Sequence, residues 1–99
     1  MIEKKPYIGQ IAISTQGRDK GNTYIIVDVP EPKQVLVADG KYKLLTKPKK
    51  KRLCHLHLTP QVNAEIAEKL GKKNKVNDQM VYHALHEYSK LNKEATNGK

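Results

Sequence analysis

The chain has 99 residues, of which 37% are hydrophobic, and its formal net charge is +9. This length is typical of a single small domain, so it excludes large multidomain enzymes and folds built around bulky cofactors. No apolar run approaches the roughly 20 residues of a membrane-spanning helix, and the first residues lack the apolar region of a secretory signal.

Five short segments within residues 1–58 have the alternating or β-branched composition of β-strands and are separated by turn residues. The dipeptide Asp39-Gly40 predicts a tight hairpin between the third and the fourth. An open sheet of five short strands would leave both faces in water, so the pattern predicts a small barrel. The expected strands cover residues 8–15, 23–29, 34–38, 41–46 and 53–58.

From residue 59 the apolar period changes from two to about 3.6, which predicts two amphipathic helices. Thr59 and Pro60 are expected to begin the first helix, as its N-cap and first helical residue, and Gly71 to end it. Asn77 is expected to cap the second helix. We therefore predict an α+β chain with three parts: a five-stranded barrel at 1–58, a two-helix extension at 59–91 and a polar, disordered tail at 92–99.

The positive charge is concentrated in the middle of the chain. Residues 31–58 hold eight basic and two acidic side chains, a net charge of +6, against +1 for residues 1–30 and +2 for residues 59–99. A localised positive field attracts polyanions, most commonly nucleic acid and secondly an anionic membrane surface. The alternative is a solvated, lysine-rich surface that aids solubility.

The densest basic segment is Lys47-Pro48-Lys49-Lys50-Lys51-Arg52. Proline favours an extended backbone, and the flanking strands would anchor both ends of the segment. We expect an ordered loop that holds phosphates from fixed positions, with lysines as point charges and Arg52 as a fork.

Signals for catalysis are sparse. No pair of carboxylates lies in an apolar setting, and no nucleophile is accompanied by a base. The segment from Gly17 to Gly21 lacks the Gly-Lys-Ser/Thr ending of a phosphate-binding loop, and a strand follows it rather than a helix. We expect no enzymatic activity, no catalytic residue and no cofactor.

Cys54, His55 and His57 are the closest group of potential metal ligands. In a strand, Cys54 would share one face with Leu56 and Leu58, and the two histidines would lie on the other face. No second cysteine pair completes a structural zinc site, so we predict no metal site. We expect His55 and His57 beside the basic loop, where either could stack on a base or contact a phosphate.

Residues 8–29 resemble a KOW motif, in which two apolar strands flank a basic, glycine-bounded loop within an SH3-like barrel. The residues that carry the resemblance are Gly9, Ile11, Ile13, Gly17, Asp19, Lys20, Gly21, Ile25, Ile26 and Val27. It covers about residues 6–59. It is closest to ribosomal proteins of the eL-fourteen type and to small bacterial KOW-domain RNA-binding proteins.

The resemblance implies ribosomal RNA as the ligand, contacted by Arg18 and Lys20 in a loop shaped by Gly17 and Gly21. Asn22 departs from the family, in which a basic residue often follows the second glycine, so one charged contact is missing there. The full set of predicted RNA contacts is Arg18, Lys20, Asn22, Lys41, Lys43, Lys47, Lys49, Lys50, Lys51, Arg52, His55 and His57.

We expect a non-enzymatic RNA-binding protein of the ribosome or its assembly, monomeric when free, with no membrane partner and no small-molecule substrate. Its single cysteine favours a reducing compartment, hence the cytoplasm. The alternative is a protein-interaction module that docks ribosomal or transcription proteins through the barrel or the apolar faces of the helices. A third hypothesis is DNA binding by the same charges.

Overall fold

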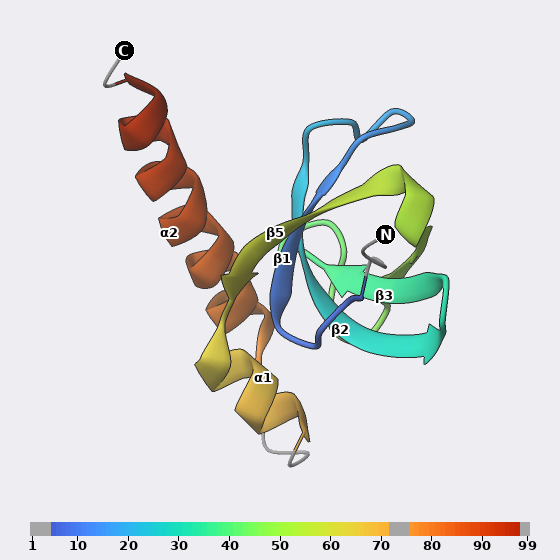
Figure 1. Cartoon of the computed structure of the whole chain (residues 1–99). Coiled ribbons are helices and arrows are strands. Elements are labelled where there is room, and N and C mark those ends of the chain that lie inside the picture. The colour runs from blue at the N-terminus through green and yellow to red at the C-terminus, as the bar shows by residue number, and fades with distance from the viewer. Residues whose placement is uncertain (1–4, 72–75, 98–99) are drawn as a thin grey trace.

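The structure combines a five-stranded antiparallel sheet with two C-terminal helices (Figure 1). This computed structural model describes residues 5–71 and 76–97, with only the course of the backbone from residue 91 on. The strands are β1 (Gln10–Ser14), β2 (Thr23–Glu31), β3 (Gln34–Ala38), β4 (Lys49–Arg52) and β5 (Leu56–Val62). The 3-10 turn η1 (Leu53–His55) precedes β5, and the helices are α1 (Ala64–Gly71) and α2 (Asp78–Asn97). The predicted α+β class is confirmed.

The sheet is curved but open. Its strands are paired in the order β4-β3-β2-β1-β5, so β4 and β5 are its two edges. Within the described residues, β4 pairs with β3 alone and β5 with β1 alone. The predicted closed barrel is therefore not confirmed. Between the two edge strands the chain passes through η1, where Leu53 N donates to Lys33 O at 2.9 Å rather than to the opposite edge.

Both faces of the sheet are covered, because β2 sends alternate side chains into two cores. Tyr24 and Ile26 lie in the first, whereas Ile25 lies in the second. A strand that is buried on both faces has a continuous apolar sequence, as β2 has from Tyr24 to Val27. The buried residues of the first core are Ala12, Tyr24, Ile26, Val35, Val37, Leu53 and Leu56. Those of the second are Ile11, Ile25 and Ala38 of the sheet with Ile66, Val81 and Leu85 of the helices.

The predicted strand at 41–46 is wrong. Asp39 Oδ1 accepts hydrogen bonds from the backbone N–H groups of Lys41, Tyr42 and Lys43, at 2.9, 2.8 and 2.7 Å. These donors cannot pair with a neighbouring strand, so the chain turns around the carboxylate. The fourth strand is instead β4, formed by the lysine run that the sequence placed in a loop.

Thr59 and Pro60 do not begin a helix; they lie in β5. The Thr59 side chain is buried, and its Oγ1 donates to Ile11 O at 2.7 Å. Gln10 Nε2 donates to Thr59 O at 2.8 Å. These two bonds lie where the register between β1 and β5 shifts, between Gln10 and Ala12. Pro60 is tolerated because β5 is an edge strand.

The helix caps are asparagines. Asn63 Oδ1 accepts a hydrogen bond from Ile66 N at 3.0 Å and thereby begins α1. Asn77 Oδ1 accepts one from Met80 N at 2.8 Å, so the predicted cap of the second helix is confirmed. Neither helix, over the residues described, is both long and apolar enough to cross a membrane.

The second helix is longer than the sequence predicted. α2 continues to Asn97, so the backbone of residues 92–97 is helical where we expected a disordered tail. No glycine or proline interrupts this segment before Gly98, and polar residues alone do not end a helix. Residues 98 and 99 of the predicted tail, and residues 72–75 between the helices, lie outside the described residues.

A substitution at Gly40 tests how closely the loop of residues 39–48 packs on α2. Gly40 has a φ of +77°, and a Cβ there would collide with Asp78 O and lie 2.7 Å from Tyr82 N. We expect Gly40→Ala to lower the free energy of unfolding by about 3 kcal/mol, combining left-handed strain with overpacking. Gly21→Ala is the matched control, since Gly21 has a φ of +93° but no atom within 4 Å. It should lose only about 1 kcal/mol. Equal losses in urea unfolding would contradict the close packing.

Candidate functional site

Strand alternation divides the basic run of β4 into two pairs. Lys49 and Lys51 are opposite Val37 and Val35 in the register with β3 and point to the same face as these core valines. Lys51 is only 8% exposed. Lys50 and Arg52 point to the other face and are exposed. The sequence predicts that these four neighbouring cations lie in one phosphate-binding loop. In the structure they have two different environments.

The inward pair is bound to Asp19, which lies in the loop between β1 and β2. Lys51 Nζ lies 3.1 Å from Asp19 Oδ1 and Lys49 Nζ lies 3.3 Å from Oδ2. The Tyr24 hydroxyl donates to Oδ2 at 2.7 Å, and the Ser14 hydroxyl donates to Oδ1 at 2.9 Å. Lys51 Nζ also donates to Ser14 Oγ at 3.0 Å. We refer to these five residues as the Asp19 cluster.

The environment of the Asp19 cluster keeps its carboxylate ionised. Burial alone would raise the pKa of Asp19, but hydrogen bonds from Tyr24, Ser14, Lys51 and Lys49 outweigh it and hold that pKa well below its usual range. Burial, followed by the hydrogen bond to Asp19, raises the pKa of the Tyr24 hydroxyl to about 12. At neutral pH one full negative charge therefore faces two lysines, and Tyr24 remains a neutral donor.

The β1–β2 loop is closed by backbone hydrogen bonds, and its cations are exposed to solvent. Gly17 and Gly21 have φ values of +89° and +93°, a conformation that favours glycine. Lys20 N donates to Gly17 O at 3.2 Å. Arg18 and Lys20 directly flank Asp19 in the sequence and are exposed. The Asp19 cluster thus fixes the loop against β4.

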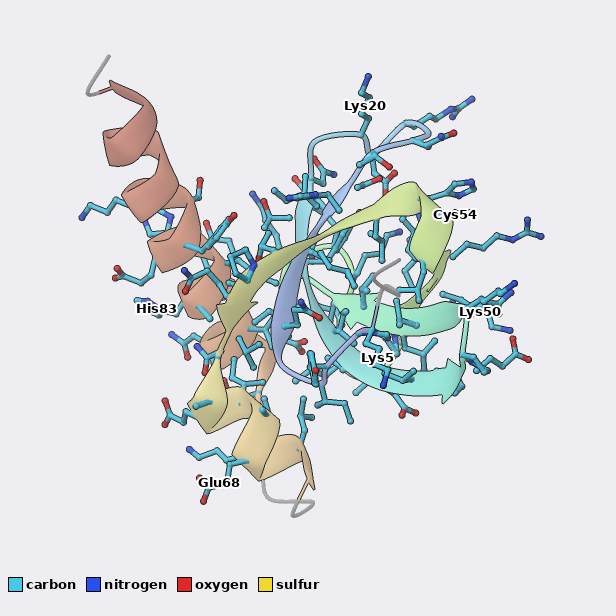
Figure 2. All side chains as sticks on the ribbon, in the orientation of Figure 1. Lys5, Lys20, Lys50, Cys54, Glu68 and His83 are labelled. Atoms are coloured by element: carbon cyan, nitrogen blue, oxygen red, sulfur yellow. The ribbon has the colours of Figure 1, made fainter. Side chains whose placement is uncertain are left out.

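Arg18 and Lys20 of the loop, with Lys50 and Arg52 of β4, form what we call the basic surface. The ion pairs of the described residues involve Lys49, Lys51 and Lys69. No described carboxylate therefore lies within ion-pair distance of the four cations of the basic surface. Figure 2 shows Lys20 projecting from the loop at one end of the sheet and Lys50 from its edge, both away from α1 and α2, which carry Glu68 and His83.

The other predicted contacts are placed differently. Asn22 and Lys41 line a shallow hollow of about 280 Å³ together with Tyr82 and His86 of α2. Lys41 Nζ lies 5.1 Å from the centre of the Tyr42 ring. The remaining lysines of the 39–48 loop are Lys43, which is half-buried, and Lys47, which is exposed.

The predicted placement of Cys54 is wrong. Residues 53–55 form the turn η1, so strand alternation does not apply, and Cys54 is exposed whereas Leu53 is buried. His55 is half-buried and its carbonyl accepts a hydrogen bond from Thr15 N at 2.9 Å. His57 is exposed on β5. In the part of the chain that the structure describes, no three His, Cys, Asp or Glu side chains could hold a metal ion together.

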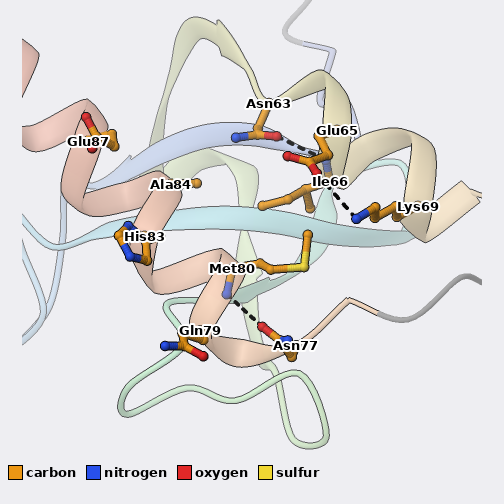
Figure 3. Close-up of a pocket in the computed structure, with 10 residues that line it drawn as sticks. All are labelled: Asn63, Glu65, Ile66, Lys69, Asn77, Gln79, Met80, His83, Ala84 and Glu87. Atoms are coloured by element: carbon orange, nitrogen blue, oxygen red, sulfur yellow. Dashed lines mark hydrogen bonds and ion pairs between the residues drawn. The ribbon is translucent and has the colours of Figure 1, made fainter.

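A further hollow lies between α1 and the beginning of α2 (Figure 3). Its volume is about 560 Å³. Glu65 and Glu87 lie in its wall, and Lys69 is paired with Glu65 at 3.3 Å. This mixture of charges does not suit a polyanion.

Comparisons with known proteins add no family to this description. No protein-family model matches the chain, and no curated protein matches its sequence. The resemblance to KOW proteins therefore remains a prediction from the residues.

Asp19→Asn tests the contribution of the Asp19 cluster to stability. Because this substitution leaves the buried Lys51 without its counter-ion, we expect a loss of about 3 kcal/mol in the free energy of unfolding at neutral pH. The pKa of Asp19 is lower in the folded than in the unfolded state. Its contribution is therefore complete above about pH 4, the ordinary range of an Asp pKa, and is lost as the pH falls below it.

Urea unfolding of both proteins as a function of pH checks this expectation. The difference in stability between wild type and Asp19→Asn should be constant from neutral pH down to about pH 5 and should shrink below about pH 4. Asp28→Asn, at an exposed carboxylate, is the control and should change stability little at any pH. A difference that stays constant into the acid range would contradict the ionised cluster.

Proposed function

We propose that the protein binds RNA, with the basic surface of Arg18, Lys20, Lys50 and Arg52 contacting the phosphate backbone. The proposal rests on one observation: two of the cations near Asp19 are paired with its carboxylate, whereas their neighbours are exposed. The Asp19 cluster fixes the β1–β2 loop to β4, and its carboxylate is paired only with Lys49 and Lys51. The flanking cations remain exposed on backbone that these contacts hold, and no described carboxylate lies within ion-pair distance of them.

Fixed, unneutralised cations suit a polyanion. A ligand phosphate that binds them releases condensed counter-ions, which supplies most of the sequence-independent affinity of proteins for nucleic acids. The two arginines can each donate two parallel hydrogen bonds to one phosphate. Because no paired aromatic side chains mark a base-reading sheet, we expect recognition of backbone and shape at this surface.

The finer assignment of the fold is part of this proposal. We infer an SH3-like sheet of the KOW type, supported by the glycine-bounded loop with positive φ at Gly17 and Gly21 between paired strands. That resemblance favours RNA over DNA, ribosomal RNA in particular, and a cytoplasmic, non-enzymatic role.

The protein-interaction alternative receives less support. Docking through the helices, one of its two routes, requires that their apolar faces remain available to a partner. Ile66, Val81 and Leu85 are instead buried against β1, β2 and β3 of the same chain. The described part of these faces is therefore used within the molecule.

The test compares two outward cations with one inward lysine. The double variant Lys50→Ala/Arg52→Ala should weaken binding of a labelled RNA hairpin about tenfold, since two exposed ion pairs are lost. It should also reduce the magnitude of the slope of log K against log salt by about 2, one for each phosphate contact. Its free energy of unfolding should change by no more than about 0.5 kcal/mol. Fluorescence anisotropy across a salt titration measures the binding.

Two further variants control this experiment. Lys51→Ala should lower stability by about 3 kcal/mol, because it removes a buried partner of Asp19, and it should leave the salt slope unchanged. Lys90→Ala, at an exposed lysine of α2, should change neither quantity. An unchanged affinity for the double variant, or equal weakening by Lys90→Ala, would rule out the basic surface as the contact. Duplex DNA as a competitor at matched salt separates RNA from DNA binding.

A further inference from the structure

A groove lies between the N-terminal segment, the β2–β3 turn and the end of β4. Its volume is about 970 Å³, near the upper end of the roughly 300–1,000 Å³ that ligand sites occupy. Three cations line it, Lys5, Lys33 and Arg52, and all three are exposed. No carboxylate is among the described residues that form its walls.

One wall of the groove carries an aromatic ring on a backbone held by hydrogen bonds. Tyr7 lines the groove and is 57% exposed. Its backbone is held at both ends by Gln10: Tyr7 N donates to Gln10 Oε1 at 3.0 Å, and Gln10 N donates to Tyr7 O at 3.0 Å. Gln10 is itself buried and bonded to Thr59 O. The backbone that carries the ring is therefore anchored to β1 and β5.

Backbone contacts also hold the part of the wall formed by the β2–β3 turn and the end of β4. Lys33 O accepts a hydrogen bond from Leu53 N at 2.9 Å, which ties the β2–β3 turn to η1. Arg52 is paired with Gln34 in the register of β4 with β3. Val29, Pro32 and Leu53 add apolar surface between these cations. The groove thus exists before any ligand arrives, which lowers the entropic cost of binding.

We propose that this groove binds an unpaired stretch of RNA, with phosphates at Lys5, Lys33 and Arg52 and with bases against Tyr7 and the apolar wall. The inference rests on the proposed function and specifies the form of RNA. Sites for single strands combine a positively charged groove with aromatic rings on which bases stack. In a duplex the bases are stacked inside the helix, so the ring and the apolar wall would have nothing to contact.

The single cysteine of the chain provides a local reporter. Cys54 is exposed and lines the groove. Iodoacetamide is uncharged, so a bound polyanion does not repel it. The duplex RNA and polyglutamate control for any effect of ligand charge on the reactivity of the thiol. The probes are an RNA hairpin with an unpaired loop, a fully paired duplex RNA of the same length and polyglutamate.

We expect the hairpin to slow alkylation of Cys54 about tenfold when its concentration is about ten times its dissociation constant. The duplex should bind in a salt-dependent way and leave the rate within about twofold of the free protein. Its phosphates can contact the basic surface, including Arg52 at the edge of the groove, but its stacked bases cannot enter the groove beside Cys54. Protection by the duplex or by polyglutamate equal to that by the hairpin would overturn the assignment to unpaired RNA.

Substitutions of exposed tyrosines complete the test. Tyr7→Ala should weaken binding of the hairpin about tenfold, as expected for one stacked base, and leave binding of the duplex unchanged. Tyr42→Ala is the matched control, because Tyr42 is 74% exposed and lies outside the groove. Lys33→Ala should reduce protection of Cys54 by the hairpin. Urea unfolding confirms that each variant is folded.

The outcomes separate the two proposals. Should the hairpin bind with the expected salt dependence while Cys54 stays fully reactive and Tyr7→Ala binds like wild type, the groove assignment is wrong and the basic surface stands. Should neither RNA bind in a salt-dependent way, the proposed function itself is wrong, and the groove assignment falls with it.

Discussion

The structure depends on one carboxylate. Asp19 brings together a loop and an edge strand that are some thirty residues apart in the chain, by accepting hydrogen bonds from Lys49 and Lys51. A carboxylate that is largely withdrawn from water needs such partners, because the loss of water is compensated only when its lone pairs are satisfied. Tyr24 and Ser14 complete this set. The cluster therefore converts two mobile lysines into structural residues and leaves their neighbours on the surface.

The two cores show how a small chain supports this arrangement. Ninety-nine residues cannot bury a large interior, and no tryptophan or phenylalanine is present to fill one. The chain compensates by using both faces of β2, so that the same strand stabilises the curved sheet and holds the helices. The helices thereby brace the face of the sheet that does not carry the Asp19 cluster.

Some parts of this fold could be predicted from local sequence and others could not. The first three strands and the Asn77 cap follow from alternation and capping chemistry. The 41–46 segment has strand-like composition, but Asp39 captures its N–H groups, a competition that composition does not reveal. Thr59-Pro60 is a good helix start, yet Gln10 and Ile11 fix Thr59 in a strand through contacts nearly fifty residues away in sequence.

The candidate site shows the same limit. A run of lysines resembles a solvated loop, and only its pairing with β3 reveals that alternate members point inward. One feature of the sequence could have indicated this arrangement: Asp19 is the lone acidic residue of a basic, glycine-bounded loop, and such a carboxylate requires a cationic partner.

The edge position of β4 has a consequence for self-association. An unpaired edge is the kind of strand along which a second copy of a protein can add itself. Antiparallel pairing there would set the cations of one copy against those of the other, so Lys50 and Arg52 would also protect this edge against aggregation.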